Sequence, residues 1–296
     1  MQIKVYRPDF AIVASPWSGV PDMFSLLSLA SDTVPFGSAA SFAADLAFAL
    51  DAALTGLCAV RMGAPMSVMD APTFLEDSAE DLRRQRNRAI AAEPAFLRWA
   101  HERGVSEASW RVVESPLDEA LSVACDWHDA VVLGLADTGQ DPWQRVSAVG
   151  SLLVTLAHPC VVVPPGAVAR LSCVALAWNG SREAMRAIHA ARPLLERAEQ
   201  IVLLKSSETD AKRYGTWHPP FDLERYLDLH GLVAEVHTLG EAGEPAEWAL
   251  LEAAEAAGAD LLVMGAYGHR RFTEWLFGGM TQHVLEHARI PLFMCH

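Results

Sequence analysis

The chain has 296 residues, of which 51% are hydrophobic, and its formal net charge at pH 7 is −14. This length supplies enough apolar side chains for two cores of ordinary domain size. The acidic balance argues against a nucleic-acid partner, because that binding draws its affinity from clustered Lys and Arg. A small phosphorylated ligand is not excluded, since backbone amides can hold phosphate without net positive charge.

Targeting and redox signals are weak. No apolar run reaches the roughly 20 residues that span a bilayer, and the first residues do not resemble a signal peptide. We therefore expect a cytoplasmic protein with no membrane contact. The five cysteines form no CxxC pair, and four of them lie in or beside apolar runs, so we expect reduced thiols. They are Cys58, Cys125, Cys160, Cys173 and Cys295.

Residues 1–23 precede the regular pattern, although 3–6 and 10–14 would suit extra edge strands. From residue 25, short apolar runs alternate with amphipathic stretches, which indicates βα units around a parallel sheet. In the first half, the predicted strands are 25–31, 56–61, 109–114, 130–135 and 160–163. The predicted helices there are 38–54, 76–103, 117–127 and 151–157.

Pro164, Pro165 and Gly166 form the natural hinge to the second half, where the same alternation returns. The predicted strands of this half are 173–178, 201–205, 232–238, 260–265 and 290–295. Its predicted helices are 181–199, 223–230, 245–257 and 280–287. The loop 206–222 is long enough to serve as a lid or a partner surface.

An internal repeat relates the two halves. Residues 129–134 (DAVVLG) are echoed by 260–265 (DLLVMG), and Gly150-Ser151 is echoed by Gly278-Gly279 before the last strand. These matches predict duplication of a unit of roughly 140 residues. We expect two domains, 1–165 and 166–296, each a doubly wound, five-stranded parallel sheet of the flavodoxin or Rossmann type. Pairing of the two final strands, 160–163 and 290–295, would join the sheets and hide an edge.

The second half carries the informative loop. Gly265 and Gly268 follow a strand, and after nine residues Gly278 and Gly279 open a helix at Met280-Thr281. Glycines let the backbone approach a ligand closely, and a helix N-terminus favours an anion. The amides of 278–281 would form a phosphate cradle, to which Thr281 adds a hydroxyl and His269 a local positive charge.

A second element is expected at the same place. Ligands of doubly wound sheets bind beyond the carboxyl ends of the strands, where the strand order reverses. Asn179 follows the first strand of the second half and could bind a base or ribose, while Ala177 and Leu204 could line the base. The alternative is an ordinary Asn-Gly turn in which Ser181 is the N-cap of the next helix.

At these residues the chain resembles the universal stress protein (UspA) family in a tandem, two-domain form. The resemblance implies adenine-nucleotide binding, since ATP-binding members carry this glycine spacing, and dimer-like pairing of two domains. Two departures are Asn179, where those members have an acidic residue, and Gly279, where they have Ser or Thr. The implied contacts are Ala177, Asn179, Leu204, Met264, Gly265, Gly268, His269, Gly278, Gly279, Met280 and Thr281.

The first half departs further from this pattern. Gly134 is followed by Leu-Ala-Asp-Thr-Gly139, which breaks the glycine spacing, although Gly150-Ser151 is kept. A duplicated unit can keep its fold and lose its site. We expect this half to be structural or to bind nothing comparable.

The leading hypothesis is a stress-response protein that binds ATP or another adenine nucleotide and responds by association, as a pseudo-dimer or homodimer, rather than by turnover. The chain contains no GxSxG elbow and no GKS/T phosphate loop. A slow ATPase would need a Mg²⁺ ligand, for which Asp260 and Asn179 are the nearest candidates. A scaffold that binds no nucleotide is the other alternative. We discount a zinc site at His283-Val-Leu-Glu-His287, because no third ligand can be named.

Overall fold

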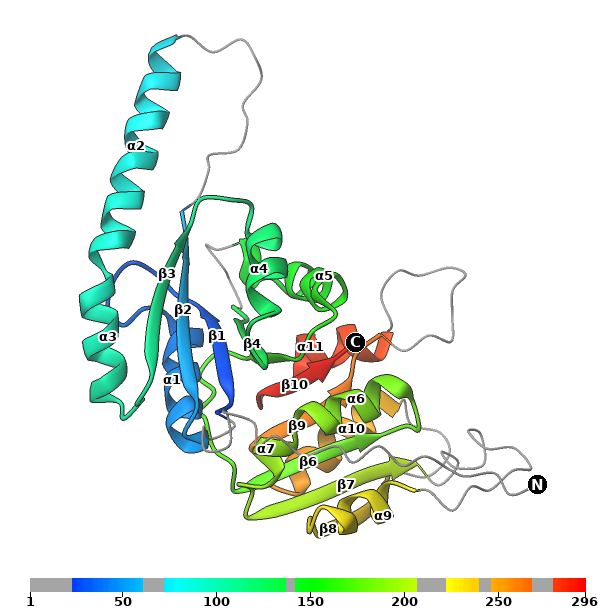
Figure 1. Cartoon of the computed structure of the whole chain (residues 1–296). Coiled ribbons are helices and arrows are strands. Elements are labelled where there is room, and N and C mark those ends of the chain that lie inside the picture. The colour runs from blue at the N-terminus through cyan, green and yellow to red at the C-terminus, as the bar shows by residue number, and fades with distance from the viewer. Residues whose placement is uncertain (1–22, 61–71, 137–141, 207–221, 240–245, 268–278) are drawn as a thin grey trace, which may run out of the picture.

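We analysed a computed structural model of the chain, which describes residues 23–60, 72–136, 142–206, 222–239, 246–267 and 279–296. Ten strands form one sheet in the order β3-β2-β1-β4-β5-β10-β9-β6-β7-β8 (Figure 1). Each half contributes five parallel strands, and the first strand of each half lies between its second and fourth strands. Both sheets are therefore doubly wound, which confirms the predicted fold class.

In the N-terminal half, the strands are β1 (Ser25–Leu29), β2 (Ala53–Ala59), β3 (Ala108–Val113), β4 (Ala130–Gly134) and β5 (Cys160–Val163). The helices are α1 (Ser38–Leu50), α2 (Pro72–Ala91), α3 (Glu93–Glu102), α4 (Leu117–Cys125) and α5 (Val146–Leu156), with a 3₁₀ turn η1 (Pro142–Gln144) before α5. Figure 1 shows α2 and α3 running end to end along one side of this half, with α2 extending past the sheet.

In the C-terminal half, the strands are β6 (Cys173–Trp178), β7 (Gln200–Ser206), β8 (Ala234–Leu239), β9 (Leu261–Gly265) and β10 (Leu292–Cys295). The helices are α6 (Arg182–Ala190), α7 (Arg192–Leu195), α9 (Leu223–Leu229), α10 (Ala246–Ala256) and α11 (Gly279–His287). The two halves thus repeat the same order of strands, with at least one helix between each consecutive pair.

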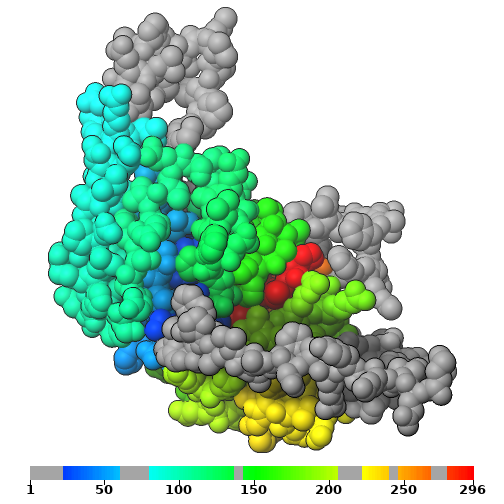
Figure 2. Space-filling model, in the orientation of Figure 1, coloured from blue at the N-terminus to red at the C-terminus, as the bar shows by residue number. Residues whose placement is uncertain are grey.

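The two sheets are joined by their final strands. β5 and β10 pair antiparallel, with Val161 opposite Phe293 and Cys160 opposite Met294. This confirms the pairing predicted from the sequence, and it removes one exposed edge from each half. In the space-filling view the red surface of the last residues lies directly against the green surface of the N-terminal half (Figure 2).

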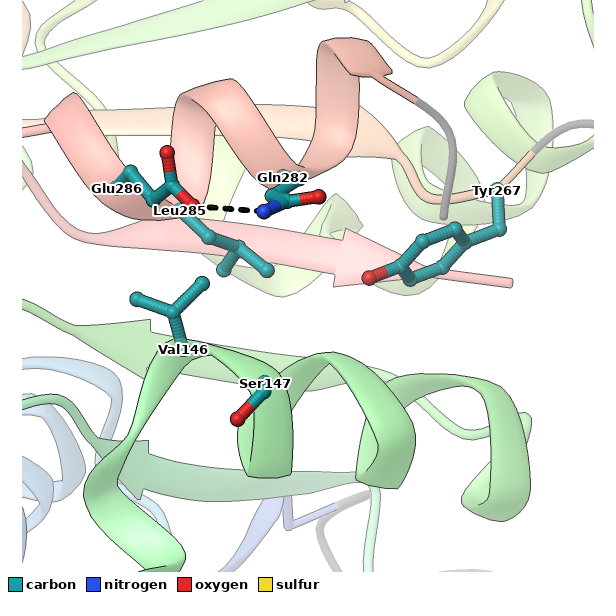
Figure 3. A pocket seen from close by; sticks show the side chains of 6 residues that line it. All are labelled: Val146, Ser147, Tyr267, Gln282, Leu285 and Glu286. Carbon is teal, nitrogen blue, oxygen red and sulfur yellow. Dashed lines mark hydrogen bonds between the residues drawn. The ribbon is translucent and has the colours of Figure 1, made fainter. Parts of the chain in front are cut away.

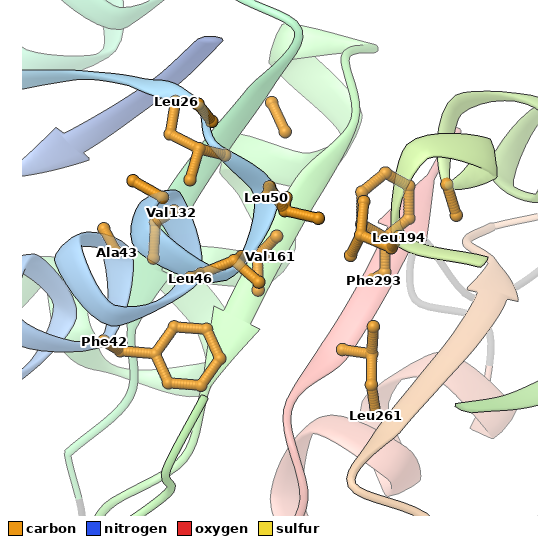
Figure 4. Packing of buried hydrophobic residues seen from close by; sticks show 14 of the residues in the cluster. Leu26, Phe42, Ala43, Leu46, Leu50, Val132, Val161, Leu194, Leu261 and Phe293 are labelled. Atoms are coloured by element: carbon orange, nitrogen blue, oxygen red, sulfur yellow. The ribbon is translucent and has the colours of Figure 1, made fainter. Parts of the chain in front are cut away.

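Both faces of the sheet are buried under helices, as expected for parallel strands made of continuous apolar runs. One face packs against α1, α3, α6, α7 and α9, and the other against α4, α5, α10 and α11. The first of these cores runs through both halves, from Phe42 and Leu46 of α1 to Phe293 of β10 and Leu194 (Figure 4). The halves therefore share continuous apolar layers.

Two predicted helices are split at prolines. The helix expected over 76–103 is two helices, and α3 has a proline in its first turn, at Pro94. The helix expected over 181–199 breaks in the same way before Pro193. Proline lacks the N–H that would continue the preceding helix, and it is tolerated in a first turn.

The cysteines behave as small apolar side chains. All five are free and buried, as predicted. Burial raises the pKa of each thiol, which keeps the thiols protonated at neutral pH. Within the described residues, no helix combines the length and the apolar composition that crossing a bilayer demands. The extra edge strands expected at 3–6 and 10–14 and most of the 206–222 loop lie outside those residues.

Candidate functional site

The carboxyl ends of β6, β7 and β9 bring together the residues expected to line a base. Ala177 is opposite Leu204 in the β6–β7 pair, and Leu176 is opposite Val263 in the β6–β9 pair. This register places Ala177, Leu204 and Met264 in one row across three strands. Leu204 and Met264 are buried in the same apolar cluster, and Ala177 packs against it. The row lies where the strand order reverses, as the sequence predicted.

Gly265, the last residue of β9, is required by close packing. A Cβ atom there would lie 2.5 Å from the Ala184 amide nitrogen and 2.7 Å from the Glu183 carbonyl carbon. The first turn of α6 thus rests directly on the end of β9, and a side chain at Gly265 would push the two apart. The glycine brings the segment after the first strand and the segment after the fourth strand into contact.

A hydrogen bond joins the strand side of the glycine-rich loop, at Tyr267, to its helix side, at Thr281. The Tyr267 amide donates a hydrogen bond to Thr281 Oγ1 at 3.3 Å, and Thr281 is 4% exposed. Thr281 was expected to contact a ligand; here its oxygen holds the strand side of the loop against the first turn of α11. Gly279 begins that helix and is exposed, and Met280 packs partly buried against the apolar layer.

The remaining loop residues of the sequence prediction are Gly268, His269 and Gly278. All three lie outside the described residues. Their contacts with a ligand therefore stay predictions.

Asn179 has the local role that the turn interpretation assigned to it. Its Oδ1 accepts a hydrogen bond from the Ser181 amide at 3.0 Å, and Ser181 Oγ accepts one from the Ala184 amide at 3.0 Å. Ser181 is thus the N-cap of α6, which satisfies one of the free donors of its first turn. The Asn179 side-chain NH₂ group takes no part in this turn and has no partner within the described ranges.

Asp260 lies at the wrong edge of the sheet to serve as the Mg²⁺ ligand that was considered for it. Its Oδ2 accepts hydrogen bonds from the amides of Ser172 and Cys173, at 3.0 and 3.2 Å. These residues are at the amino end of β6, opposite the edge that carries the loop. Asp129 accepts a hydrogen bond from the Ser25 amide in the same way at 2.8 Å. In each half, the aspartate at the repeated position therefore binds the backbone at the start of the first strand.

The HxxEH segment of α11 is an aromatic stack. The rings of His283 and His287 lie 4.1 Å apart with an interplanar angle of 20°, and Trp248 packs against His283 at 4.3 Å. His287 Nδ1 is 2.9 Å from the His283 carbonyl oxygen. Among the described residues, no three His, Cys, Asp or Glu side chains are grouped to hold a metal ion.

Two residues near the loop were missed by sequence reasoning. Glu183 is 5% exposed, and it lies in the first turn of α6 against the end of β9. Tyr267 has a positive φ of 50° and reaches the N-terminal half, because a Cβ atom on Gly150 would lie 2.7 Å from its hydroxyl. Burial raises the pKa of Tyr267. No sequence signal marks either residue, since both contacts depend on how elements pack.

A hollow of about 320 Å³ adjoins Tyr267 between α5 and α11 (Figure 3). Gln282 donates a hydrogen bond to Glu286 Oε1 at 2.8 Å on one of its walls. Val146 and Ser147 form the opposite wall, on α5. None of the predicted nucleotide contacts that the structure describes lines this hollow, and its described lining comes from both halves of the chain.

Fold and loop together define a tandem protein of the doubly wound α/β class. Residues 174–296 match the model of the Universal stress protein family, which confirms the resemblance seen in the sequence. The C-terminal half is a universal stress protein domain, and the N-terminal half repeats its architecture.

Solved structures share the tandem fold. A universal stress protein from Archaeoglobus fulgidus DSM 4304 aligns with a TM-score of 0.65 at 13% identity, covering 92% of this chain and 97% of that one. A putative universal stress protein from Pseudomonas aeruginosa UCBPP-PA14 aligns with a TM-score of 0.52 at 15% identity, covering 93% of each chain. No functionally curated protein sequence matches the chain. These likenesses show a common fold over both halves.

Proposed function

We propose that the protein is a stress-response protein that binds an adenine nucleotide, ATP above all, in its C-terminal half and responds by changing its association. The observation that carries the proposal is the hydrogen bond from Tyr267 to Thr281, which holds both sides of the glycine-rich loop beside the end of β9. The loop has the spacing of ATP-binding family members, and a phosphate would lie against the described part of its helix.

The chemistry of the flanking residues suits the parts of a nucleotide. The amides of Gly279 to Thr281 lie at the N-terminal end of the described part of α11, where the helix dipole would favour an anion. The row of Ala177, Leu204 and Met264 would provide an apolar wall for a base. The NH₂ group of Asn179, which has no hydrogen-bond partner among the described residues, would donate to an oxygen or nitrogen of the ribose or base.

Binding is a better proposal than turnover. Mg²⁺ would be held by the nucleotide's phosphates and by oxygen ligands of the protein. Asp260 is at the opposite edge of the sheet and cannot be one of these ligands. The other candidate for a Mg²⁺ ligand is Asn179 Oδ1, which already accepts a hydrogen bond from the Ser181 amide. We therefore assign no hydrolysis to this half.

Calorimetric titration with ATP and Mg²⁺ tests the proposal on two variants of one position. A Cβ atom at Gly279 would meet no atom within 4 Å, so both Gly279→Asp and Gly279→Ala fit sterically. Aspartate in a first turn stabilises a helix, so a loss of binding in that variant would come from charge and not from unfolding. We expect wild type and Gly279→Ala to bind, and Gly279→Asp to lose at least about tenfold in affinity, as like charges meet.

Absence of binding by the wild-type protein to ATP, ADP, AMP or a cyclic nucleotide would end the proposal. The scaffold function would then take its place. One observation favours it: apolar side chains are exposed next to the edge strand β8, with Val233 85% and Leu229 68% exposed. Unpaired edges and exposed apolar groups are typical association surfaces. Sedimentation of wild type and Val233→Lys, with and without ATP, distinguishes regulated from constitutive association.

A further inference from the structure

The N-terminal half contains a larger hollow than the one between the halves, where the sequence predicted no comparable site. Its volume is about 750 Å³, and the ends of β1, β2 and β4 form its floor. Small-molecule sites commonly range from about 300 to 1,000 Å³ and lie at such strand ends in doubly wound sheets. Size and place both suit a small organic ligand.

The floor of the hollow is apolar. Leu29 of β1 is opposite Leu57 of β2, and Leu133 lies near the end of β4. Leu57 and Leu133 are almost fully buried, and Trp143 adds an indole ring to the lining. Apolar and aromatic surfaces of this kind hold the body of a ligand and leave its orientation to a few polar groups.

Among the lining residues that the structure describes, the charged groups are one acid and one base, and they pair with each other. Arg88 Nε lies 3.3 Å from Asp32 Oδ2, with the Asp32 side chain 25% exposed and the Arg88 side chain 68% exposed. Asp32 follows β1, and Arg88 comes from α2. Asp32 contacts Nε, and within the described part of the chain the two terminal nitrogens of the guanidinium have no hydrogen-bond partner, so their donors are available. A planar guanidinium fixed from one side matches the two oxygens of a carboxylate.

A nucleotide does not suit this hollow. In the C-terminal half Gly279 is the first described residue of the helix after the loop, whereas α5 begins at Val146 and contains Gly150 in its interior. The Ala136 amide donates to the Gln144 carbonyl oxygen at 3.1 Å, so the chain closes on itself where the other half has its loop. The formal charges of Asp32 and Arg88 cancel, so the side chains of the described lining residues carry no net positive charge to balance a triphosphate.

We propose that this hollow binds a small, mainly apolar molecule with an aromatic or alicyclic body and a single carboxylate. The body would lie over Leu29, Leu57 and Leu133, and the carboxylate would accept hydrogen bonds from the terminal nitrogens of Arg88. Asp32 is a positioning residue that fixes the guanidinium. Cys58 also lines the hollow, but burial raises its pKa to about 11, so its thiol stays protonated and binding is non-covalent. This site is independent of the nucleotide proposed for the other half.

A matched pair of probes tests the proposal on the full chain. 2-Naphthoate has the required body and carboxylate, and 2-naphthylmethanol has the same body without the charge. Titration calorimetry should show naphthoate binding about tenfold more tightly to the wild type, the size expected of a charged hydrogen-bonded pair. Arg88→Gln should remove this preference. Arg84→Gln, one turn away on α2 with a side chain 64% exposed, should keep it.

Amide chemical shifts locate the probe. Naphthoate should perturb the amides of Ser38 and Leu57, which belong to residues lining the hollow, and leave those of α11 unchanged. Equal affinity for the two probes, or an unchanged preference in Arg88→Gln, would overturn the carboxylate assignment. Perturbations confined to other surfaces, or ATP displacing naphthoate from Ser38 and Leu57, would overturn the site or its ligand class.

Discussion

Gly150 offers a direct test of the contact between the halves. It lies inside α5, and a Cβ atom there would lie 2.7 Å from the Tyr267 hydroxyl but 3.9 Å from the ring carbon Cζ. Gly150→Ala should gain about 1 kcal/mol of helix propensity and lose about 1–3 kcal/mol to overpacking. We therefore expect the free energy of unfolding to change by between zero and about 2 kcal/mol, in the destabilising direction.

Removing the Tyr267 hydroxyl should turn the effect of Gly150→Ala on the free energy of unfolding from destabilising to stabilising. In a Tyr267→Phe background the nearest atom to the added Cβ would be at ordinary contact distance, so Gly150→Ala should stabilise the protein by about 1 kcal/mol. The coupling energy between the two positions should be about 1–3 kcal/mol in a double-mutant cycle. Equilibrium urea unfolding of the four proteins measures it. An equal effect of Gly150→Ala in both backgrounds would show that Tyr267 does not dock on α5.

Three further predictions concern single groups. Ser181→Ala removes the N-cap of α6 and should lower the free energy of unfolding by about 1 kcal/mol, measured by urea titration; an unchanged value would contradict the cap. Asp260→Asn should cost about 1 kcal/mol, because its hydrogen bonds to the backbone weaken, yet leave ATP affinity unchanged in calorimetry; a change in affinity would return Asp260 to the site. Burial, with the Asp32 charge, raises the pKa of Cys58 from 9.0 to about 11. The unfolded state therefore releases the Cys58 thiol proton at a lower pH than the folded state. The free energy of unfolding should fall as the pH rises from about 9 to about 11, and it should fall less steeply in Cys58→Ala.

The repeat and the apolar periods were sufficient to predict the fold. Both doubly wound sheets follow from alternating runs, and the pairing of residues 160–163 with the last strand followed from matching the two halves. The proximity of Ala177, Leu204 and Met264 could also be predicted, because the strand order determines which strand ends lie side by side. These predictions depend on local pattern and topology, which a sequence carries directly.

Predictions failed where a residue's role depends on packing between distant elements. Gly150 aligns with the loop glycines in the repeat, but α5 starts a turn earlier, and the glycine makes room for Tyr267 instead of a phosphate. Asp260 was one of the two candidate Mg²⁺ ligands, although it is the first residue of the predicted strand 260–265 that ends in the glycine. A strand separates its two ends in space, so the carboxylate belongs to the opposite edge. Asp32 and Arg88 meet only because α2 passes the end of β1.

The measurement that tests the central claim most directly is an experimental structure of the full chain with ATP and Mg²⁺. We expect phosphate density at the amides of α11 next to Gly279, and a base against Ala177 and Leu204. Density in the N-terminal hollow beside Arg88, or an empty loop at a saturating ATP concentration, would contradict it.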